Sequence, residues 1–220
     1  MLSKSEGKTK IKLLVKIGYF LSSENPNEAI KYLDEAIELS DRTNNADALF
    51  NKGVALWHLG EINQSDKLYE NAVEIYDEFN DSLSMIKVFN SQAINHQMKG
   101  NVDLAFETFL RSLDFAKKIG DKTTIFNTLL NIGIMYDNNS DYDKCLYYYY
   151  EALKYADEVD KSSLALLQSY IAEVYLTLNN NEKAEEYLKD AVKNSILSND
   201  TNSLIWAYSG LGKIELDKKN

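Results

Sequence analysis

Side chains that could carry out nucleophilic, acid–base or metal chemistry are few and scattered. The chain has two histidines, His58 and His96, and a single cysteine, Cys145. A metal site needs several ligands close together, and an activated nucleophile needs a base within hydrogen-bond reach. No spacing in the sequence suggests either, and one cysteine cannot form a disulfide within the chain. We therefore predict no catalytic residue, no metal and no cofactor, with His96 packed and His58 at a rim.

One short segment, Ser209 to Lys213, has the glycines and lysine of a phosphate-binding loop. Such a loop also needs a glycine five residues before its second glycine and a serine or threonine after the lysine. Those two positions hold Ala207 and Ile214. The segment is therefore predicted to be helical, and the many carboxylates of the chain are interpreted as solvated groups on helix surfaces.

Four consecutive tyrosines, Tyr147 to Tyr150, stand in the segment CLYYYYEALKYA. Such rings could form a site for phosphate transfer, stacking or peptide contact, or they could be part of a packed wall. The choice depends on the elements that carry them.

The composition predicts a chain that is nearly all helix. It has 220 residues, of which 45% are hydrophobic, with one proline and nine glycines. Sheet proteins need more turn residues than this. The net charge of −10 argues against a nucleic-acid partner. Five lysines among residues 1–20 are interpreted as a solvated helix face. No apolar run is long enough to cross a membrane or to act as a secretory signal, so we expect no membrane insertion.

Small residues recur at a period of about 40 residues. Three series of small residues share the period, and we call the first of them the knots. The knots are Gly18, Gly53, Ala93, Gly133, Ala172 and Gly212. The second series is Ala29, Ser65, Ala105, Cys145 and Ala184, and the third is Ala36, Ala72, Ser112, Ala152 and Ala191. Small residues let two helices approach closely while large neighbours fill the space around them. The period therefore predicts stacked helix pairs.

The fourth unit reads Leu129-x2-Ile132-Gly133-x2-Tyr136, then Cys145-x3-Tyr149, then Ala152. This pattern resembles the tetratricopeptide repeat, in the long-unit form of kinesin light chains and of the Rap regulators of bacterial signalling. The chain departs from the family in its longer period and in lacking the proline that usually closes each repeat.

The resemblance implies an all-α fold, a right-handed α-α superhelix of five helix hairpins plus one additional C-terminal helix. We predict one domain over 1–220, with units at about 9–45, 46–81, 82–121, 122–160 and 161–200 and a half-unit at 201–218. Turns within hairpins are expected near Pro26, Gly60, Gly100, Ser140 and Asn180. Turns between units are expected at Thr43-Asn44-Asn45, Asn80-Asp81, Gly120-Asp121, Val159-Asp160 and Ser198-Asn199-Asp200. The apolar last helix suggests a fragment of a longer protein, or a further contact surface and self-association around Trp206.

The family binds ligands on the concave side, which the first helix of each unit lines. The resemblance therefore implies a groove for a protein or an extended peptide, in which rings act as anchors and asparagines pair with the peptide backbone. Asn51 and Asn131 occupy the slot two before the knot, whereas Lys16, Ser91 and Tyr170 depart from it. The predicted groove residues are Lys16, Tyr19, Phe50, Asn51, Val54, Trp57, Asn90, Ile94, Gln97, Leu130, Asn131, Ile134, Asp137, Tyr170 and Glu173.

The repeat register also assigns the tyrosines. Tyr149 takes the aromatic core slot, Tyr148 is expected to be half-buried, and Tyr147 and Tyr150 are expected to point outward from the convex side. For function we expect a non-enzymatic scaffold, namely the sensory or interaction region of a bacterial signalling protein. The alternatives are a stand-alone adaptor that bridges two proteins and a Rap-like regulator that acts on a response regulator. A cytoplasmic location is expected, or a periplasmic one for an excised sensor region.

Overall fold

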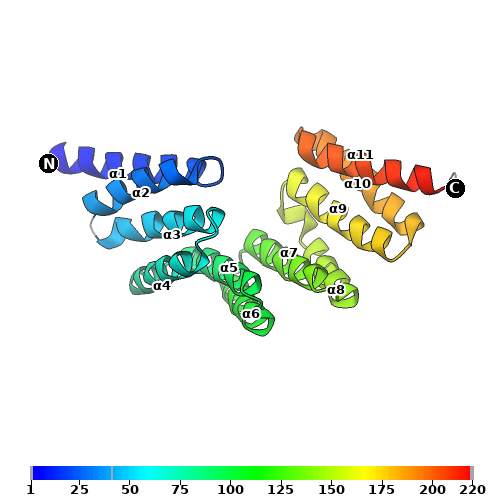
Figure 1. Cartoon of the computed structure of the whole chain (residues 1–220), viewed down its shortest axis with the longest axis horizontal. Helices are drawn as coiled ribbons and strands as arrows, with labels where there is room; N and C mark the ends of the chain where they lie inside the picture. Colours follow the sequence, from blue (N-terminus) through cyan, green and yellow to red (C-terminus); the bar gives the residue numbers. More distant parts are fainter. Residues whose placement is uncertain (1, 41, 219–220) are drawn as a thin grey trace. The chain divides into compact units, whose positions relative to one another are not determined.

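A computed structural model describes residues 2–40 and 42–218, and side-chain burial for 7–40 and 45–218. These residues form only helices, without a strand, which confirms the predicted fold class (Figure 1). The helices are α1 (Leu2–Leu21), α2 (Pro26–Leu39), α3 (Arg42–His58), α4 (Ile62–Glu78), α5 (Ser82–Met98), α6 (Val102–Ile119), α7 (Lys122–Asn138), α8 (Tyr142–Leu153), the short 3-10 helix η1 (Ala156–Glu158), α9 (Lys161–Thr177), α10 (Asn181–Ser198) and α11 (Thr201–Asp217). Within this part of the chain, no helix is long and apolar enough to span a membrane.

Consecutive helices pack in pairs, as in an α-solenoid. The hairpins are α1–α2, α3–α4, α5–α6, α7–α8 and α9–α10, and α11 packs against α10 and α9. The predicted five hairpins and one extra helix are therefore confirmed. The chain divides into two compact units between Ile119 and Gly120, which is also a predicted repeat boundary. The first unit contains three hairpins, and the second contains two hairpins and α11. The number of domains stays a prediction.

The knots lie where the two helices of a hairpin touch, as the repeat pattern predicted. A methyl group on the three glycine knots of the hairpins, Gly18, Gly53 and Gly133, would collide with a large side chain of the second helix. Its nearest contacts would be 2.4 Å from Leu33 at Gly18, 2.5 Å from Tyr69 at Gly53 and 2.3 Å from Tyr149 at Gly133. Ala93 and Ala172, the alanine knots, are fully buried. Glycine is thus required for close approach in three of the hairpins.

The first hairpin turn, predicted near Pro26, is capped by Asn25. Asn25 precedes α2, and its Oδ1 accepts a hydrogen bond from the backbone N–H of Glu28. Its Nδ2 donates to the Glu28 carboxylate at 2.8 Å. Pro26 occupies the first helical turn, where a missing N–H costs nothing. Later turns use a left-handed residue, either glycine, as at Gly60 and Gly100, or a polar residue such as Ser140.

One predicted turn is wrong. Thr43-Asn44-Asn45 was expected to separate the first two units, yet α3 already begins at Arg42, so this segment lies inside the helix. The preceding helix ends at Leu39, with Ser40 as its cap. The first turn of a helix tolerates threonine and asparagine because its N–H groups need no partner within the helix. Burial of Ala46 and Ala48 holds the start of α3 against its neighbours.

Candidate peptide-binding surface

The first unit has a hollow between the first helices α1 and α3. It has a volume of about 380 Å³. Lys16, Tyr19 and Asn51, three of the predicted groove residues, share it. The full lining is Ile11, Lys12, Val15, Lys16, Tyr19, Asp47 and Asn51. We call this the lysine hollow.

Charge in the lysine hollow is predominantly positive. Lys12 and Lys16 are exposed and make no ion pair with any residue that the structure describes. The hollow also contains Asp47, whose Oδ1 accepts a hydrogen bond from the Tyr76 hydroxyl at 2.6 Å. Burial, together with this carboxylate, raises the pKa of Tyr76, so the hydroxyl stays protonated and donates. The two lysines therefore remain available for an acidic ligand group.

A second hollow lies beside the first, among α3, α4 and α5. It has a volume of about 180 Å³ and is lined by Val54, Trp57, His58, Tyr69, Ser91 and Ile94. The predicted groove residues Val54, Trp57 and Ile94 meet here. The Trp57 indole donates from Nε1 to the Met98 sulfur at 2.9 Å, and its ring stands edge-on to His58, with centroids 4.8 Å apart. We call this the tryptophan hollow, and its walls suit an apolar side chain.

The other predicted residues of the first unit contribute less. Phe50 packs against the Tyr69 ring, with centroids 5.6 Å apart, and so supports the wall. Asn90 accepts a hydrogen bond from Ser112 Oγ on α6 at 2.7 Å, so its amide oxygen is used by the fold. Gln97 is half-buried and lines neither hollow.

In the second unit the predicted residues do not gather into one hollow. Leu130 is buried, whereas Asn131, Ile134 and Asp137 are half-buried on α7. Burial raises the pKa of the Asp137 carboxyl. Of the predicted groove residues of this unit, Glu173 lines a small hollow of about 40 Å³. The other residues of its lining are Ser169, Leu176, Leu188, Trp206, Ser209, Gly210 and Lys213. Most of these residues come from positions that the groove prediction did not include.

Trp206 and Tyr170 form an aromatic stack with the core tyrosine. The Tyr170 ring lies parallel to Tyr149, with centroids 6.1 Å apart, and Trp206 meets Tyr170 edge-on at 5.1 Å. Tyr170 is therefore part of the wall as well as of the predicted groove. No single-unit sequence pattern predicts this contact, because it joins residues of three different helices.

The four tyrosines divide almost as predicted. Tyr149 is completely buried, Tyr148 is half-buried against Tyr136, and Tyr147 is 58% exposed. The outward orientation predicted for Tyr150 is wrong, because its hydroxyl lies 2.5 Å from that of Tyr175 and it is half-buried. Tyr187 on α10 adds a third ring, and the repeat pattern of one unit cannot reveal such contacts from neighbouring helices.

Two further side chains, His58 and Cys145, carry groups that could take part in chemistry. His58 is exposed at the rim of the tryptophan hollow, and Cys145 is buried with a free thiol. Among the described residues, no three of His, Cys, Asp and Glu come together as a metal site.

Comparison with known proteins settles the family. A tetratricopeptide repeat profile matches residues 124–196, and a second one matches residues 46–79. Both segments contain the knots and hairpins described above. The chain is a tetratricopeptide repeat protein. No curated protein sequence matches this repeat protein.

Solved structures share the fold of this repeat protein. Aspartyl phosphate phosphatase F of Bacillus subtilis is 20% identical with a TM-score of 0.77, and the match covers 92% of this chain and 56% of that one. A signal transduction ATPase with a tetratricopeptide repeat sensor, from Pyrococcus horikoshii, is 23% identical with a TM-score of 0.77. The match covers 94% of this chain and 32% of the ATPase chain. The Rap conjugation gene regulator of plasmid pLS20, in complex with the Phr* peptide, is 19% identical with a TM-score of 0.73. The match covers 90% of this chain and 58% of the regulator chain.

These identities show the fold alone. The repeat protein spans about half of the phosphatase chain and a third of the ATPase chain. Its family and fold are those of protein-interaction scaffolds.

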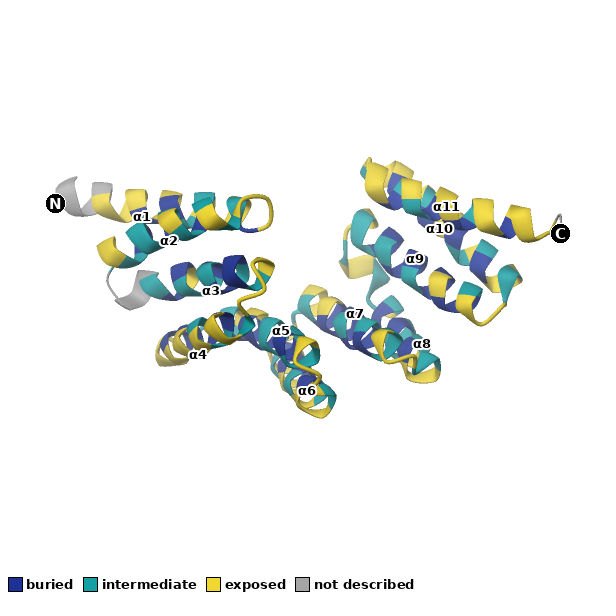
Figure 2. Cartoon of the chain, in the orientation of Figure 1, coloured by how far each residue is buried: buried dark blue, intermediate teal, exposed yellow. Residues whose placement is uncertain are grey.

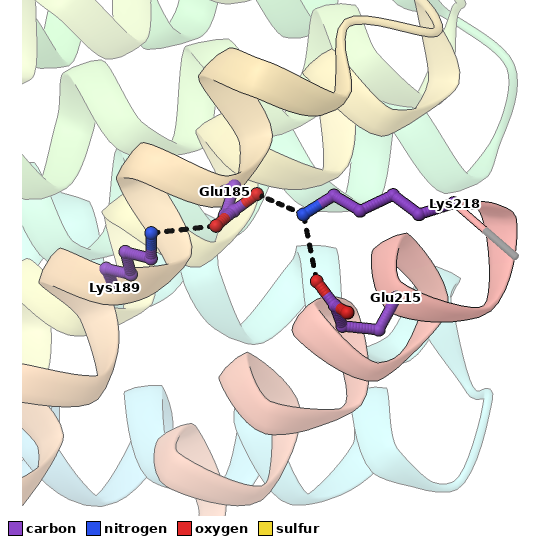
Figure 3. Close-up of polar contacts among 4 residues, drawn as sticks. All are labelled: Glu185, Lys189, Glu215 and Lys218. Carbon is purple, nitrogen blue, oxygen red and sulfur yellow. Dashed lines mark hydrogen bonds and ion pairs between the residues drawn. The ribbon is translucent and has the colours of Figure 1, made fainter.

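The last two helices of the repeat protein are joined by a charged cluster, shown in Figure 3. Glu185 on α10 lies 2.7 Å from the Lys189 ammonium and 2.8 Å from that of Lys218, which also meets Glu215. Hydrogen bonds from the two lysines, with their positive charge, lower the pKa of Glu185 from 4.5 to about 2. A carboxyl whose pKa is lower in the folded chain than in the unfolded chain stabilises the fold at any pH above the unfolded-state pKa. This contribution is lost as the pH falls towards the folded-state pKa.

We expect Glu185→Gln to weaken the acid sensitivity of the fold. Between pH 4.5 and about 2 the native chain loses the contribution of Glu185, whereas the amide has no proton to gain. The thermal midpoint, measured by circular dichroism across this range, should therefore fall less in the variant. Glu186→Gln, at an exposed neighbour on the same helix, is the matched control and should follow the native curve. Equal slopes for all three proteins would show that the cluster does not contribute.

Proposed function

We propose that the first helices of the first unit bind an extended peptide with an acidic and a large apolar side chain. The observation that carries the proposal is that the two hollows share one helix. Asn51 on α3 lines the lysine hollow, and Trp57 on the same helix lines the tryptophan hollow. The cationic hollow suits a carboxylate, and the aromatic one suits an apolar anchor.

The spacing of the hollows sets the spacing of the ligand. Asn51 and Trp57 are six residues apart on α3, which is about 9 Å at the rise of an α-helix. An extended peptide advances about 3.3–3.6 Å per residue. The acidic and apolar residues of the ligand should therefore be about three positions apart. Asn51, which lines the lysine hollow, would pair with the peptide backbone.

The proposed biological role is the sensory or interaction region of a bacterial signalling protein. Support comes from the shared fold with a tetratricopeptide repeat sensor and with a regulator solved together with a peptide. A stand-alone adaptor and a Rap-like regulator remain the alternatives. We also propose that the chain has no enzymatic activity, and phosphatase or cyclase turnover by the purified 220 residues would contradict this.

Self-association through α11 stays a prediction, although Trp206 is not its best centre. The indole packs on Tyr170 inside the second unit. The more exposed side chains of α11 are Ile205, Tyr208 and Leu216.

A peptide-binding measurement tests the proposed groove. The probes are fluorescent synthetic peptides with a glutamate and, about three residues later, a leucine or phenylalanine. Trp57→Ala should weaken binding of these probes at least about tenfold, as expected for a buried aromatic anchor. Lys16→Glu should abolish the preference for glutamate over lysine in the probe, and Asn51→Ala should weaken all probes alike.

Two variants serve as controls. Lys67→Glu makes the same charge change on the exposed surface of α4, and it should not alter the preference. Asn131→Ala removes the equivalent asparagine of the second unit, which lines neither hollow. Unchanged affinity in Trp57→Ala and Asn51→Ala, with circular dichroism showing intact folds, would rule out the groove.

A further inference from the structure

The last helix, α11, has an apolar face that nothing in the described chain covers. The position seven residues before each knot is buried in all five earlier first helices, as Ile11, Ala46, Ile86, Phe126 and Ala165. The equivalent residue of α11 is Ile205, which is 60% exposed. The position four residues before the knot is half-buried at Leu49 and buried in the other four earlier first helices. In α11 this position is Tyr208, which is 54% exposed.

The knot of α11, Gly212, has no large side chain of the described residues packed against it. Gly212 continues the series of Gly18, Gly53 and Gly133, whose missing methyl groups leave room for a large side chain of the second helix. A methyl group on Gly212 would meet nothing within 4 Å, whereas at the other three knots it would lie 2.3–2.5 Å from that side chain. Ile205, Tyr208 and Gly212 are spaced three and four residues apart, so they share one helix face. We call this face the open face of α11. Figure 2 shows that α11 carries exposed residues, in yellow, along its length.

The other side of α11 is firmly held. Ala207 and Ile214 are buried, and Gly210 touches Leu188 of α10 so closely that a methyl group there would lie 2.8 Å from it. Asp200 caps the helix by accepting from Ser203, and it also accepts from Ser162 of α9. Lys218 ties the other end to Glu185 of α10 (Figure 3). The open face is thus presented by a fixed helix and needs no rearrangement to become accessible.

We propose that the open face of α11 binds an amphipathic helix of another protein, side by side, with a large side chain inserted against Gly212. The interface repeated along the chain identifies the occupant, because second helices cover the equivalent faces. Each of these helices has a small residue, a large one four positions later and a small one three positions after that, as in Ala184, Leu188 and Ala191 of α10. The partner helix carries the same pattern.

This site is independent of the peptide groove. It lies on the second unit, whereas the lysine and tryptophan hollows belong to the first. It also takes a helix instead of an extended peptide. Failure of one proposal therefore leaves the other intact.

A helical probe made from the chain itself tests the proposal. The probe is a fluorescent peptide of residues 180–198, which contains the cap and the full length of α10, titrated into the full chain by anisotropy. We expect saturable binding, which Gly212→Phe in the chain weakens at least tenfold because the new ring fills the hole. Since a Cβ at position 212 meets nothing within 4 Å and phenylalanine is a better helix former than glycine, Gly212→Phe should not lower the thermal midpoint. A probe with Leu188→Asp should bind at least tenfold more weakly.

The other outcomes would overturn the proposal. Binding that Gly212→Phe does not weaken would mean that the probe exchanges with α10 or adheres elsewhere. Equal weakening by Leu13→Asp, at an exposed leucine of α1, would show unspecific adhesion. Absence of binding at millimolar probe would exclude a helix site. If the native chain forms dimers by sedimentation and Gly212→Phe makes it monomeric, a second copy covers the face instead of a partner helix.

Discussion

Replacing Tyr149 by alanine is expected to lower the free energy of unfolding by about 3–5 kcal/mol, the range for truncating a buried aromatic ring. The Tyr149 side chain is fully buried, fits against the glycine knot at Gly133 and stacks on Tyr170. Its removal leaves a cavity between α7 and α8 that neighbouring rings cannot fill without leaving their own contacts. Urea denaturation followed by circular dichroism measures the loss.

Tyr147→Ala is the matched control for this experiment. It removes the same side chain from the same helix two residues earlier, but Tyr147 is 58% exposed. Surface substitutions of this kind usually change stability by less than about 0.5 kcal/mol. A larger loss for Tyr147→Ala than for Tyr149→Ala would contradict this register of α8, because it would require the buried and exposed rings to be exchanged.

Replacing Gly133 by alanine is expected to cost about 1–3 kcal/mol, although alanine is the better helix former. The new methyl group would lie 2.3 Å from the ring atoms Cδ1 and Cε1 of Tyr149. These are not the flexible end of a long side chain but part of a rigid, enclosed ring. One of the two helices must therefore shift. A lower denaturation midpoint with an unchanged circular dichroism spectrum is the expected result.

Gly212→Ala, at the equivalent position of α11, is expected to change stability in the opposite direction from Gly133→Ala. Nothing lies within 4 Å of the added methyl group, so only the helix preference for alanine acts. The fold should gain up to about 1 kcal/mol. A loss at Gly212 comparable to that at Gly133 would contradict the open face, because it would require a neighbour that the described chain does not place there.

Much of the fold could be predicted because it depends on small residues at a fixed period. The knots identify each hairpin, and Tyr149 was assigned correctly from its distance to Cys145 and Ala152. Turn boundaries were less certain, since threonine and asparagine occur in a first helical turn as readily as in a loop. This is why the turn predicted at Thr43 to Asn45 was wrong.

The candidate site was harder to predict because hollows form between helices of different hairpins. The positions of Lys16, Val54 and Trp57 in the hollows could be predicted from the register of each residue within its own helix. The contribution of Lys12 and Asp47 to the lysine hollow depends on how α1 packs on α3, which no single-unit pattern contains. Tyr150 was misplaced for the same reason, since its partners Tyr175 and Tyr187 come from α9 and α10.

The buried small residue Cys145 has a consequence for the redox behaviour of the protein. Burial, assisted by the negative charge of Asp137, raises the pKa of its thiol to about 12, so the reactive thiolate is almost absent at neutral pH. The side chain is fully enclosed between α7 and α8. Oxidants and thiol reagents therefore reach the sulfur only when this hairpin opens, and disulfide-linked pairs of chains can arise only from opened molecules. The rate at which a thiol reagent modifies Cys145 therefore reports how often this hairpin opens.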